Sequence, residues 1–382
     1  MPIDRWQQAA AYAEWMVGHR RRLHEEPEVG LALPDTHAYV ADVLAGLGLS
    51  PEVHEGAGVT AAISGREGGR PVVLRADMDA LPVREETGLP FASRRDGAMH
   101  ACGHDLHMAM LLGAARCLVE EPPRRDTVLV FQPGEESDRG AVPTLARHAH
   151  LRLDDAETFA IHVHATWPAG TVFHRPGVFM AAGDWFRITF TGPGAHASQP
   201  HLAGNPIVAG ADVVHGLRRA VAELAADEHL VATVTESLMG NTVNVIPAEG
   251  SLRGTLRTLS KERRAALVTT LRELAERAAK DADLAVSVEI VEGYPPVVND
   301  PTYDERLVAA LRDAPVEARP MADPSMVIED YAYFLDRWPG SMVYLGAQVP
   351  GHHAFNHAAD AVFDEGVLAV GAGLHLLAAD GL

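Results

Sequence analysis

The spacing of apolar residues predicts that strands and helices alternate over the first half of the chain. Apolar residues recur at helical spacing in residues 36–48 and 105–119, as they do on the buried side of an amphipathic helix. Short apolar runs, which are typical of buried strands, occur at 58–64, 71–76, 127–132 and 158–164. This alternation predicts an α/β domain built on a mostly parallel sheet with flanking helices.

The pattern changes near residue 181. The strand that begins with Asp-Trp-Phe-Arg-Ile-Thr-Phe is longer and alternates polar with apolar residues, as in a half-buried sheet. Two helices and three further strands are expected at 205–226, 260–281, 231–237, 251–258 and 284–292. These elements make a two-helix, four-strand α+β unit of the kind that is inserted into a larger domain.

Residues 300–382 again alternate helix with strand after Tyr294-Pro295-Pro296. We therefore expect the first part of a catalytic domain at 1–181, an inserted domain at 182–293 and the second part of the catalytic domain at 294–382. A chain of 382 residues exceeds the size at which a single core stops growing, so two domains are the default.

The net charge and the number of cysteines restrict the expected binding partners and cellular compartment of the protein. The net charge of −20 disfavours nucleic acid and anionic membranes as partners. Two cysteines, Cys102 and Cys117, make no disulfide framework and fit a reducing compartment. The N-terminal segment has the pattern of a charged amphipathic helix rather than a signal peptide, and no apolar run is long enough to span a bilayer. We expect a soluble cytoplasmic protein.

One cysteine and three histidines crowd into nine positions at 99–107, Met-His-Ala-Cys-Gly-His-Asp-Leu-His. Thiolate and imidazole are the ligands that borderline divalent metals prefer. Cys102 and His104, two residues apart, can point the same way from a strand or a tight loop. A Cys-x-His pair is not diagnostic alone, so the other ligands must come from elsewhere in the chain.

Further candidate ligands lie near the ends of predicted strands, where sites of α/β domains collect. Glu135 and Glu136 follow an apolar strand and Pro-Gly. Neighbouring side chains in extended backbone face opposite ways, so one glutamate can hold a metal while the other faces a substrate. Spacing leaves the choice among the histidines open: His162 or His164, and His352, His353 or His357. Together these residues predict a dinuclear metal site.

Several longer segments resemble one family of enzymes. They include LRADMDALPVREETGLPF at 74–91, MHACGHDLHMAMLLGAA at 99–115, FQPGEE at 131–136, GPGAHASQPHLAGNPI at 192–207 and NVIPAEGSLRGTLRT at 244–258. The chain resembles the aminoacylase/carboxypeptidase superfamily of metal-dependent amidohydrolases, and within it the branch of hippurate hydrolases, N-acyl-amino-acid deacylases and auxin–amino-acid conjugate hydrolases. The resemblance implies a phosphorylase/hydrolase-like catalytic domain and a ferredoxin-like inserted domain that serves as a lid and dimerises.

The resemblance also implies roles for individual residues. Two divalent ions, of zinc, manganese, nickel or cobalt, would be bound by Cys102, His104, Glu136, His162 and His357. Glu135 would be the general base that takes a proton from a metal-activated water and passes it to the leaving amine. His196 would stabilise the oxyanion in the partner subunit's site, which implies a homodimer. Arg257, assisted by Asn244, would bind the substrate carboxylate.

Some positions depart from the family pattern. Ala358-Ala359-Asp360 replaces the usual Ser-Pro-Arg beside His357, and Gly134 stands where alanine is usual. Arg75-Ala76-Asp77 replaces the His-x-Asp of the family's peptidases, as is typical of the cysteine-containing branch. Carboxylates that could support ligating histidines are Asp77, Asp105 and Glu329.

The expected reaction is therefore hydrolysis of the amide bond of a small N-acyl amino acid. One alternative is a dipeptidase or carboxypeptidase that uses the same metal centre. A second, of a different class, is a non-catalytic protein that binds an acyl amino acid; a missing ligand or a missing Glu135 would favour it, and none is missing.

Overall fold

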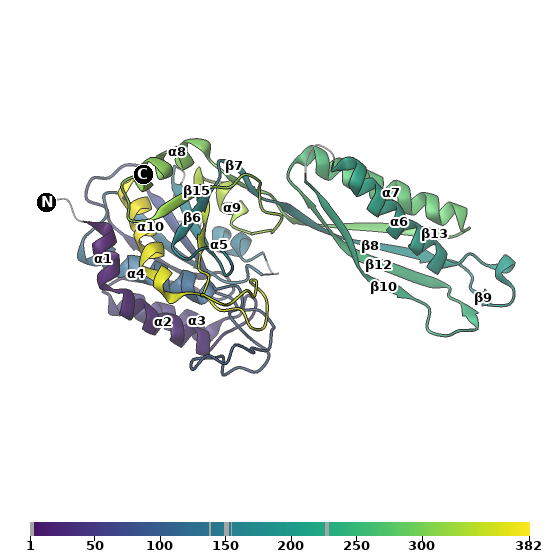
Figure 1. The fold of residues 1–382 in the computed structure, drawn as a ribbon, viewed down its shortest axis with the longest axis horizontal. Helices are drawn as coiled ribbons and strands as arrows, with labels where there is room; N and C mark the ends of the chain where they lie inside the picture. The colour runs from purple at the N-terminus through teal and green to yellow at the C-terminus, as the bar shows by residue number, and fades with distance from the viewer. Residues whose placement is uncertain (1–3, 137–138, 149–152, 154, 226–228) are drawn as a thin grey trace. The chain divides into compact units, whose positions relative to one another are not determined.

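The computed structural model describes residues 4–136, 139–148, 153, 155–225 and 229–382 (Figure 1). The chain forms two compact units. Unit 1 comprises Met1–Phe179, Val298–Asp323 and Glu329–Leu382, and unit 2 comprises Met180–Val297 and Pro324–Ile328. The inserted segment of unit 2 thus begins and ends within a few residues of the range expected from the sequence, and a short later segment joins it.

Unit 1 is built on an eight-stranded sheet with the order β1-β2-β4-β3-β5-β16-β6-β15. Strands β4, β3, β5 and β16 run parallel to one another, and β15 runs parallel to β6. The pairs β1–β2, β2–β4 and β16–β6 are antiparallel. The strands are β1 (Glu52–His54), β2 (Gly58–Ile63), β3 (Val72–Asp77), β4 (Thr127–Gln132), β5 (Glu157–His164), β6 (Thr171–His174), β15 (Glu317–Pro320) and β16 (Gly340–Gly346). The predicted mostly parallel sheet is confirmed.

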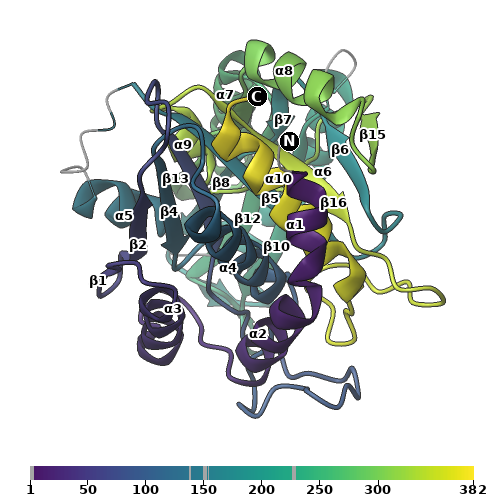
Figure 2. The same cartoon turned by 90° about the vertical axis from the view of Figure 1, so that its left-hand side faces the viewer.

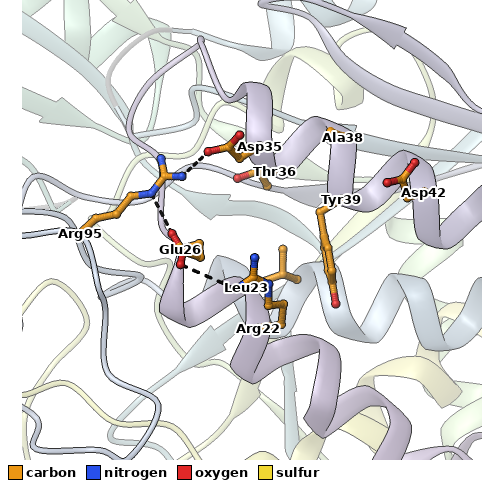
Figure 3. A pocket seen from close by; sticks show the side chains of 9 residues that line it. All are labelled: Arg22, Leu23, Glu26, Asp35, Thr36, Ala38, Tyr39, Asp42 and Arg95. Atoms are coloured by element: carbon orange, nitrogen blue, oxygen red, sulfur yellow. Dashed lines mark hydrogen bonds and ion pairs between the residues drawn. The ribbon is translucent and has the colours of Figure 1, made fainter.

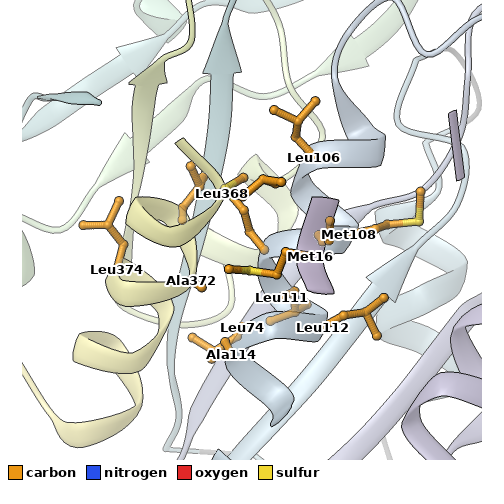
Figure 4. Close-up of a cluster of buried hydrophobic side chains, with 14 of the residues drawn as sticks. Met16, Leu74, Leu106, Met108, Leu111, Leu112, Ala114, Leu368, Ala372 and Leu374 are labelled. Carbon is orange, nitrogen blue, oxygen red and sulfur yellow. The ribbon is translucent and has the colours of Figure 1, made fainter. Parts of the chain in front are cut away.

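Strands β3 and β4 are buried at every residue, which explains why they are continuous apolar runs in the sequence. The helices of unit 1 are α1 (Arg5–Ala11), α2 (Ala13–Glu25), α3 (Pro34–Gly46), α4 (His104–Glu120), α5 (Ala141–Arg147), α8 (Pro301–Leu311), α9 (Ala332–Leu335) and α10 (Leu368–Asp380). Figure 2 shows α4 and α10 side by side, and both contact β3 and β5. Their core brings Met16 of α2, Leu111 of α4 and Ala372 of α10 together with Leu74 of β3 (Figure 4).

The N-terminal segment differs from its expected single helix because it breaks at Tyr12. Tyr12 has φ −106° and separates α1 from α2. Its hydroxyl donates to Glu120 at 2.6 Å, and the Arg116 guanidinium lies 4.2 Å from its ring centre. The break therefore lets the tyrosine side chain contact α4.

Unit 2 contains the predicted α+β arrangement. Its antiparallel sheet has the order β10-β12-β8-β13, and α6 and α7 cover one face of it (Figure 1). The elements are β8 (Ala182–Thr191), α6 (Pro206–Leu224), β10 (Val231–Met239), β12 (Glu249–Thr258), α7 (Lys261–Asp281) and β13 (Ala285–Tyr294). Alternate residues Phe186, Ile188 and Phe190 of β8 are buried against the helices, as the period of two requires.

The remaining short elements are β7 (Gly177–Met180), β9 (Ala195–His196), β11 (Val245–Ile246), β14 (Val297–Asn299), and the 3-10 turns Pro200–Leu202 and Glu365–Val367. Strands β9 and β11 pair with each other, as do β7 and β14. Among the described residues, the helices are all too short or too polar to cross a membrane.

Candidate metal centre

A tight turn at the start of α4 places Cys102 and His104 beside the end of β5. Gly103, between them, has φ 86°, a left-handed conformation that glycine adopts at little cost. A Cβ atom at Gly103 would lie 2.4 Å from Cγ2 of Val163 and 3.3 Å from the Phe363 ring. The glycine thus allows both the backbone turn and the close approach to β5.

Five predicted ligands converge in unit 1. Cys102 Sγ lies 3.4 Å from His162 Nε2 and 3.2 Å from His357 Nε2. The carboxylate of Glu136 lies 3.5 Å from His357 Nε2 and 3.8 Å from His104 Nε2. Two groups of ligating atoms, each within 4.8 Å of one another, share the sulfur: Cys102 with His104 and His162, and Cys102 with Glu136 and His357. These five side chains would hold two divalent cations.

In both His104 and His162, Nδ1 contacts a backbone carbonyl oxygen, and Nε2 is the nitrogen that faces the other predicted ligands. His104 Nδ1 donates to the carbonyl oxygen of Asp79 at 2.8 Å, and its buried Nε2 makes no hydrogen bond within the described part of the chain. His162 Nδ1 lies 2.9 Å from the carbonyl oxygen of Val163, and its Nε2 faces Cys102. A bond from the second ring nitrogen is the usual support of a ligating histidine.

Neighbouring histidines are engaged otherwise. His107 Nδ1 lies 2.5 Å from a carboxylate oxygen of Asp77, and its Nε2 accepts the backbone N–H of Val163 at 2.9 Å, so neither nitrogen is available to a metal. The ring of His164 stacks on Trp167 at 4.1 Å, and burial lowers its pKa to about 4. Of His162 and His164, it is His162 whose Nε2 lies 3.4 Å from Cys102 Sγ.

The loop that carries His357 is fixed by a residue that sequence reasoning missed. Asn356 donates to the carbonyl oxygens of Val163 at 3.0 Å and Cys102 at 3.3 Å, and accepts the N–H of Ala165 at 2.9 Å. His357 itself has φ 74°, an uncommon conformation outside glycine that marks functional or strained positions. His352, His353 and His357 are all exposed, so it is the contact with Cys102 that singles out His357. In the sequence, the only indication of this role is that Asn356 directly precedes the predicted ligand His357.

Asp79 positions the two glutamates. Its carboxylate accepts the backbone N–H of Glu135 at 3.0 Å and that of Glu136 at 3.2 Å. Gly134, immediately before them, has φ 70°, so the departure from alanine at this position suits a left-handed backbone. Glu135 is buried and accepts the N–H of Asp330 at 3.4 Å. Asp79 follows the predicted strand at 71–76, but sequence spacing could not show that it accepts hydrogen bonds from the backbone of the two glutamates.

A buried arginine pairs with carboxylates next to this site. Arg75 donates to Asp77 at 2.7 Å, to Glu329 at 3.0 Å and to Asp330 at 2.9 Å, and all four side chains are almost fully buried. Asp77 also binds His107 and lies 3.7 Å from His104 Nε2. Asp77 thus contacts the predicted ligands directly, whereas Glu329 binds Arg75 and accepts the N–H of Tyr331.

Asp105 makes different contacts from those expected. Its carboxylate accepts Arg20 Nε at 2.7 Å and lies 2.9 Å from His24 Nδ1. Both partners belong to α2, so Asp105 ties the start of α4 to that helix rather than supporting a ligating histidine. The sequence could not reveal this, because Arg20 and His24 precede Asp105 by 85 and 81 positions in the chain.

The electrostatics of the centre favour a bound cation. Burial, and next the charge of Glu136, raise the pKa of the Cys102 thiol well above its ordinary value. Burial, and next Glu329, raise the pKa of Glu135, and burial raises the pKa of Glu136 to about 7. Burial lowers the pKa of His357, which favours the neutral form that binds metals. Thiolate and carboxylates at this density need a compensating positive charge, so the donor set fits divalent ions.

The other predicted site residues lie in unit 2. His196 of β9 is opposite Val245 of β11, next to Asn244. The N–H and hydroxyl of Ser198 lie 3.1 and 2.8 Å from His196 Nδ1. Because the backbone N–H must donate to Nδ1, the ring proton is on Nε2, which makes His196 a donor.

Arg257, near the end of β12, is half-buried. It donates to Thr255 and to the carbonyl oxygen of Leu256, and burial lowers its pKa despite the charge of Asp184. Among the residues that the structure describes, no carboxylate forms an ion pair with it. An arginine in this state can pair with an incoming carboxylate.

A separate cavity of about 420 Å³ lies between α2 and α3 (Figure 3). Its lining includes Arg95, which pairs with Glu26 at 3.3 Å and also binds Asp35. None of the predicted site residues lines this cavity. Arg22 and Arg95 both pair with Glu26 there. Because no predicted site residue lines the cavity, it is not the candidate site.

The α/β fold and the clustered thiol, imidazoles and carboxylates define a hydrolase of the metal-dependent class. Residues 73–380 match the family described as Peptidase family M20/M25/M40. The chain belongs to this family.

Relatives within the family include two named enzymes. The chain is 33% identical to thermostable carboxypeptidase 1 of Saccharolobus solfataricus, over 96% of this chain and 95% of the relative. It is 34% identical to N-acetyl-L-cysteine deacetylase of Bacillus subtilis, over 92% of this chain and 85% of the relative. Among solved structures, the YXEP protein of Bacillus subtilis, a dinuclear metal-binding peptidase of family M20, is similar with a TM-score of 0.83 at 30% identity, covering 97% of this chain and 98% of that protein.

Proposed function

We propose that the protein hydrolyses the amide bond of small N-acyl amino acids at a dinuclear metal centre. The observation that carries this proposal is the convergence of two potential ligand groups on one sulfur atom, Cys102 Sγ, beside the buried carboxylate of Glu135. The deacetylase relative acts on an N-acyl amino acid, which supports the same substrate class here. A carboxypeptidase relative keeps peptide hydrolysis as the second candidate.

The proposed ligands are Cys102, His104, Glu136, His162 and His357. Divalent ions at such a centre lower the pKa of water and polarise a carbonyl group. Glu135 is the proposed general base: it takes the proton of the attacking water and delivers it to the leaving amine. The hydrogen bonds that the backbone N–H groups of Glu135 and Glu136 donate to the Asp79 carboxylate hold Glu135 in a fixed place for this transfer.

Unit 2 is proposed to supply substrate contacts and the subunit interface. Arg257 and Asn244 would bind the substrate carboxylate, and the Nε2–H of His196 would donate to the oxyanion of the partner subunit's reaction. Two exposed apolar side chains, at the end of β10 and in the segment that leads from it to β11, support a homodimer interface: Val243 is 98% exposed and Leu238 is 62% exposed. Large exposed apolar side chains that gather in one region are typical of interaction surfaces.

The test of the general base uses Glu135→Gln with a panel of substrates. The variant should keep the wild-type content of zinc, manganese or cobalt, because its side chain is not a proposed ligand, while turnover falls about 10²–10⁴-fold. The wild-type enzyme should prefer N-acetyl amino acids to dipeptides. Wild-type turnover by Glu135→Gln would eliminate this residue as the base, and a preference for dipeptides would favour the peptidase alternative.

The role of His196 across a dimer has its own test. Glu135→Gln and His196→Ala should each have little activity alone. After the two variants are unfolded, mixed and refolded, random pairing should restore about a quarter of the wild-type sites, because half of the dimers contain one intact pair. No recovery, with dimers demonstrated by light scattering, would show that the histidine does not act in the partner's site.

A further inference from the structure

A second group of potential metal ligands lies at the edge of the eight-stranded sheet. Glu52 and His54 belong to the edge strand β1, and His148 directly follows α5. One ligand atom from each side chain lies within 4.8 Å of the others. None of the three residues is among those proposed for the catalytic centre, and Figure 2 shows β1, β2 and α5 close together in unit 1.

Strand geometry explains why these side chains meet. Glu52 and His54 are two residues apart on β1 and therefore point to the same face. Antiparallel pairing puts Thr60 of β2 opposite Glu52, so Thr60 shares that face as well. The Thr60 hydroxyl lies 3.3 Å from Nδ1 of His148. The rings of His54 and His148 are 4.9 Å apart, centre to centre.

The state of the nitrogen atoms favours a cation at this place. The Thr60 hydroxyl lies within hydrogen-bond distance of Nδ1 of His148, and a contact of this kind at one ring nitrogen is usual for histidines that bind a metal through the other. Nε2 of His54 is shielded from solvent and makes no hydrogen bond to a described residue. The carboxylate of Glu52 is 3.8 Å from this nitrogen, too far for a hydrogen bond. A shielded polar atom in this state is costly, and a bound cation would remove the cost.

We infer that Glu52, His54 and His148 form a third divalent-cation site, with zinc as its preferred ion. Two imidazoles and one carboxylate are a common zinc ligand set, which leaves a fourth position for water. Ligands about 2.1 Å from a tetrahedral zinc ion are about 3.4 Å apart. Side chains of Glu52 and His54 are 50% and 35% exposed, so they can rotate to close this small difference. Magnesium, which prefers oxygen ligands, should bind poorly.

The expected role of the ion is structural. It would connect the edge strand to the end of α5, which begins soon after Glu136. Existing bonds already hold this helix at its first residue and at its middle: the Ala141 N–H donates to Asp330 at 2.9 Å, and the Thr144 hydroxyl donates to the carbonyl oxygen of Ala57 at 2.9 Å. Zinc at the edge would add a third anchor to the segment that follows the catalytic glutamates.

The test is equilibrium dialysis of the full-length protein against graded zinc. His54→Gln should bind about one equivalent of zinc per chain less than the wild type, with unchanged turnover once the catalytic metals are supplied. Glu52→Gln provides a second variant at an exposed position. His215→Gln, which replaces an exposed histidine of α6, is the matched control and should bind as much zinc as the wild type.

Thermal unfolding gives an independent measurement. Raising the zinc concentration above that needed for full activity should raise the Tm of the wild type and of His215→Gln, but not that of His54→Gln. Magnesium should raise none of them. Equal zinc binding by the wild type and both edge variants, together with equal zinc-dependent shifts in Tm, would overturn the proposal. These readouts compare variants with intact catalytic residues, so they stand or fall separately from the proposed reaction.

Discussion

Replacing Gly103 by alanine should damage stability and metal binding together. The alanine must adopt the glycine's φ of 86°, which costs about 1–2 kcal/mol. Its Cβ would also lie 2.4 Å from Cγ2 of buried Val163 and 3.3 Å from the Phe363 ring, and relieving such overpacking costs roughly 1–3 kcal/mol. We therefore expect a loss of about 2–5 kcal/mol in the free energy of unfolding of unit 1.

Gly88→Ala separates the two contributions. Gly88 has φ 69°, yet nothing lies within 4 Å of the position of a new Cβ. This control should lose only the backbone part, about 1–2 kcal/mol. The difference between the two variants therefore measures the close approach of the turn to β5. Metal binding should weaken in Gly103→Ala but not in Gly88→Ala, because relief of the clash at Gly103 moves Cys102 and His104.

Urea unfolding followed by tryptophan fluorescence is the assay. Four of the five tryptophans lie in unit 1, and Trp185→Phe removes the signal of unit 2, which matters because two units need not unfold together. Measurements with a chelator isolate packing, and measurements with zinc add the linkage to metal binding. The reasoning is refuted if Gly103→Ala unfolds at the same urea concentration as Gly88→Ala and retains full metal content.

Two further predictions concern buried charges in unit 1. Arg75→Met leaves three buried carboxylates without their cation and should cost about 3–5 kcal/mol of unfolding free energy. Arg84→Met, at the exposed ion pair with Asp96, should cost less than about 1 kcal/mol. Equal urea midpoints for the two variants would contradict this. Burial raises the pKa of Glu157, but hydrogen bonds from Arg125 and Arg306 outweigh it and lower the pKa below the ordinary value. Its stabilising contribution is therefore present above the unfolded-state pKa and is lost as the pH falls below about 5, so Glu157→Gln should flatten the acid side of the plot of unfolding free energy against pH, and an unchanged slope would count against this assignment.

The sequence predicts the elements whose burial is continuous or strictly periodic. Strand β4 has the predicted bounds of 127–132, and α4 begins within one residue of its prediction, because a two-sided core requires an unbroken apolar run. Short strands such as β6 and β15 were not predicted, since four residues carry too little periodicity. The break at Tyr12 depends on contacts with Glu120, far away in the chain.

In the candidate metal centre, too, the local sequence pattern predicts some features, whereas others depend on contacts between distant residues. Spacing predicts that Cys102 and His104 lie together, since they flank one turn. It cannot choose His162 over His164, because both lie on the same face of β5; the stacking of His164 on Trp167 separates them. The support that Asp79 gives to Glu135 joins segments 56 positions apart, and no local pattern records such a bond.

Cobalt substitution tests the central claim most directly. A thiolate bound to cobalt gives an intense charge-transfer band in the near ultraviolet, which neither imidazole nor carboxylate ligands produce. The account predicts this band in the wild type and in Cys117→Ser, which removes the other buried cysteine, and predicts its loss together with activity in Cys102→Ser. A band that persists in Cys102→Ser, with full cobalt content and wild-type turnover, would contradict the proposed centre.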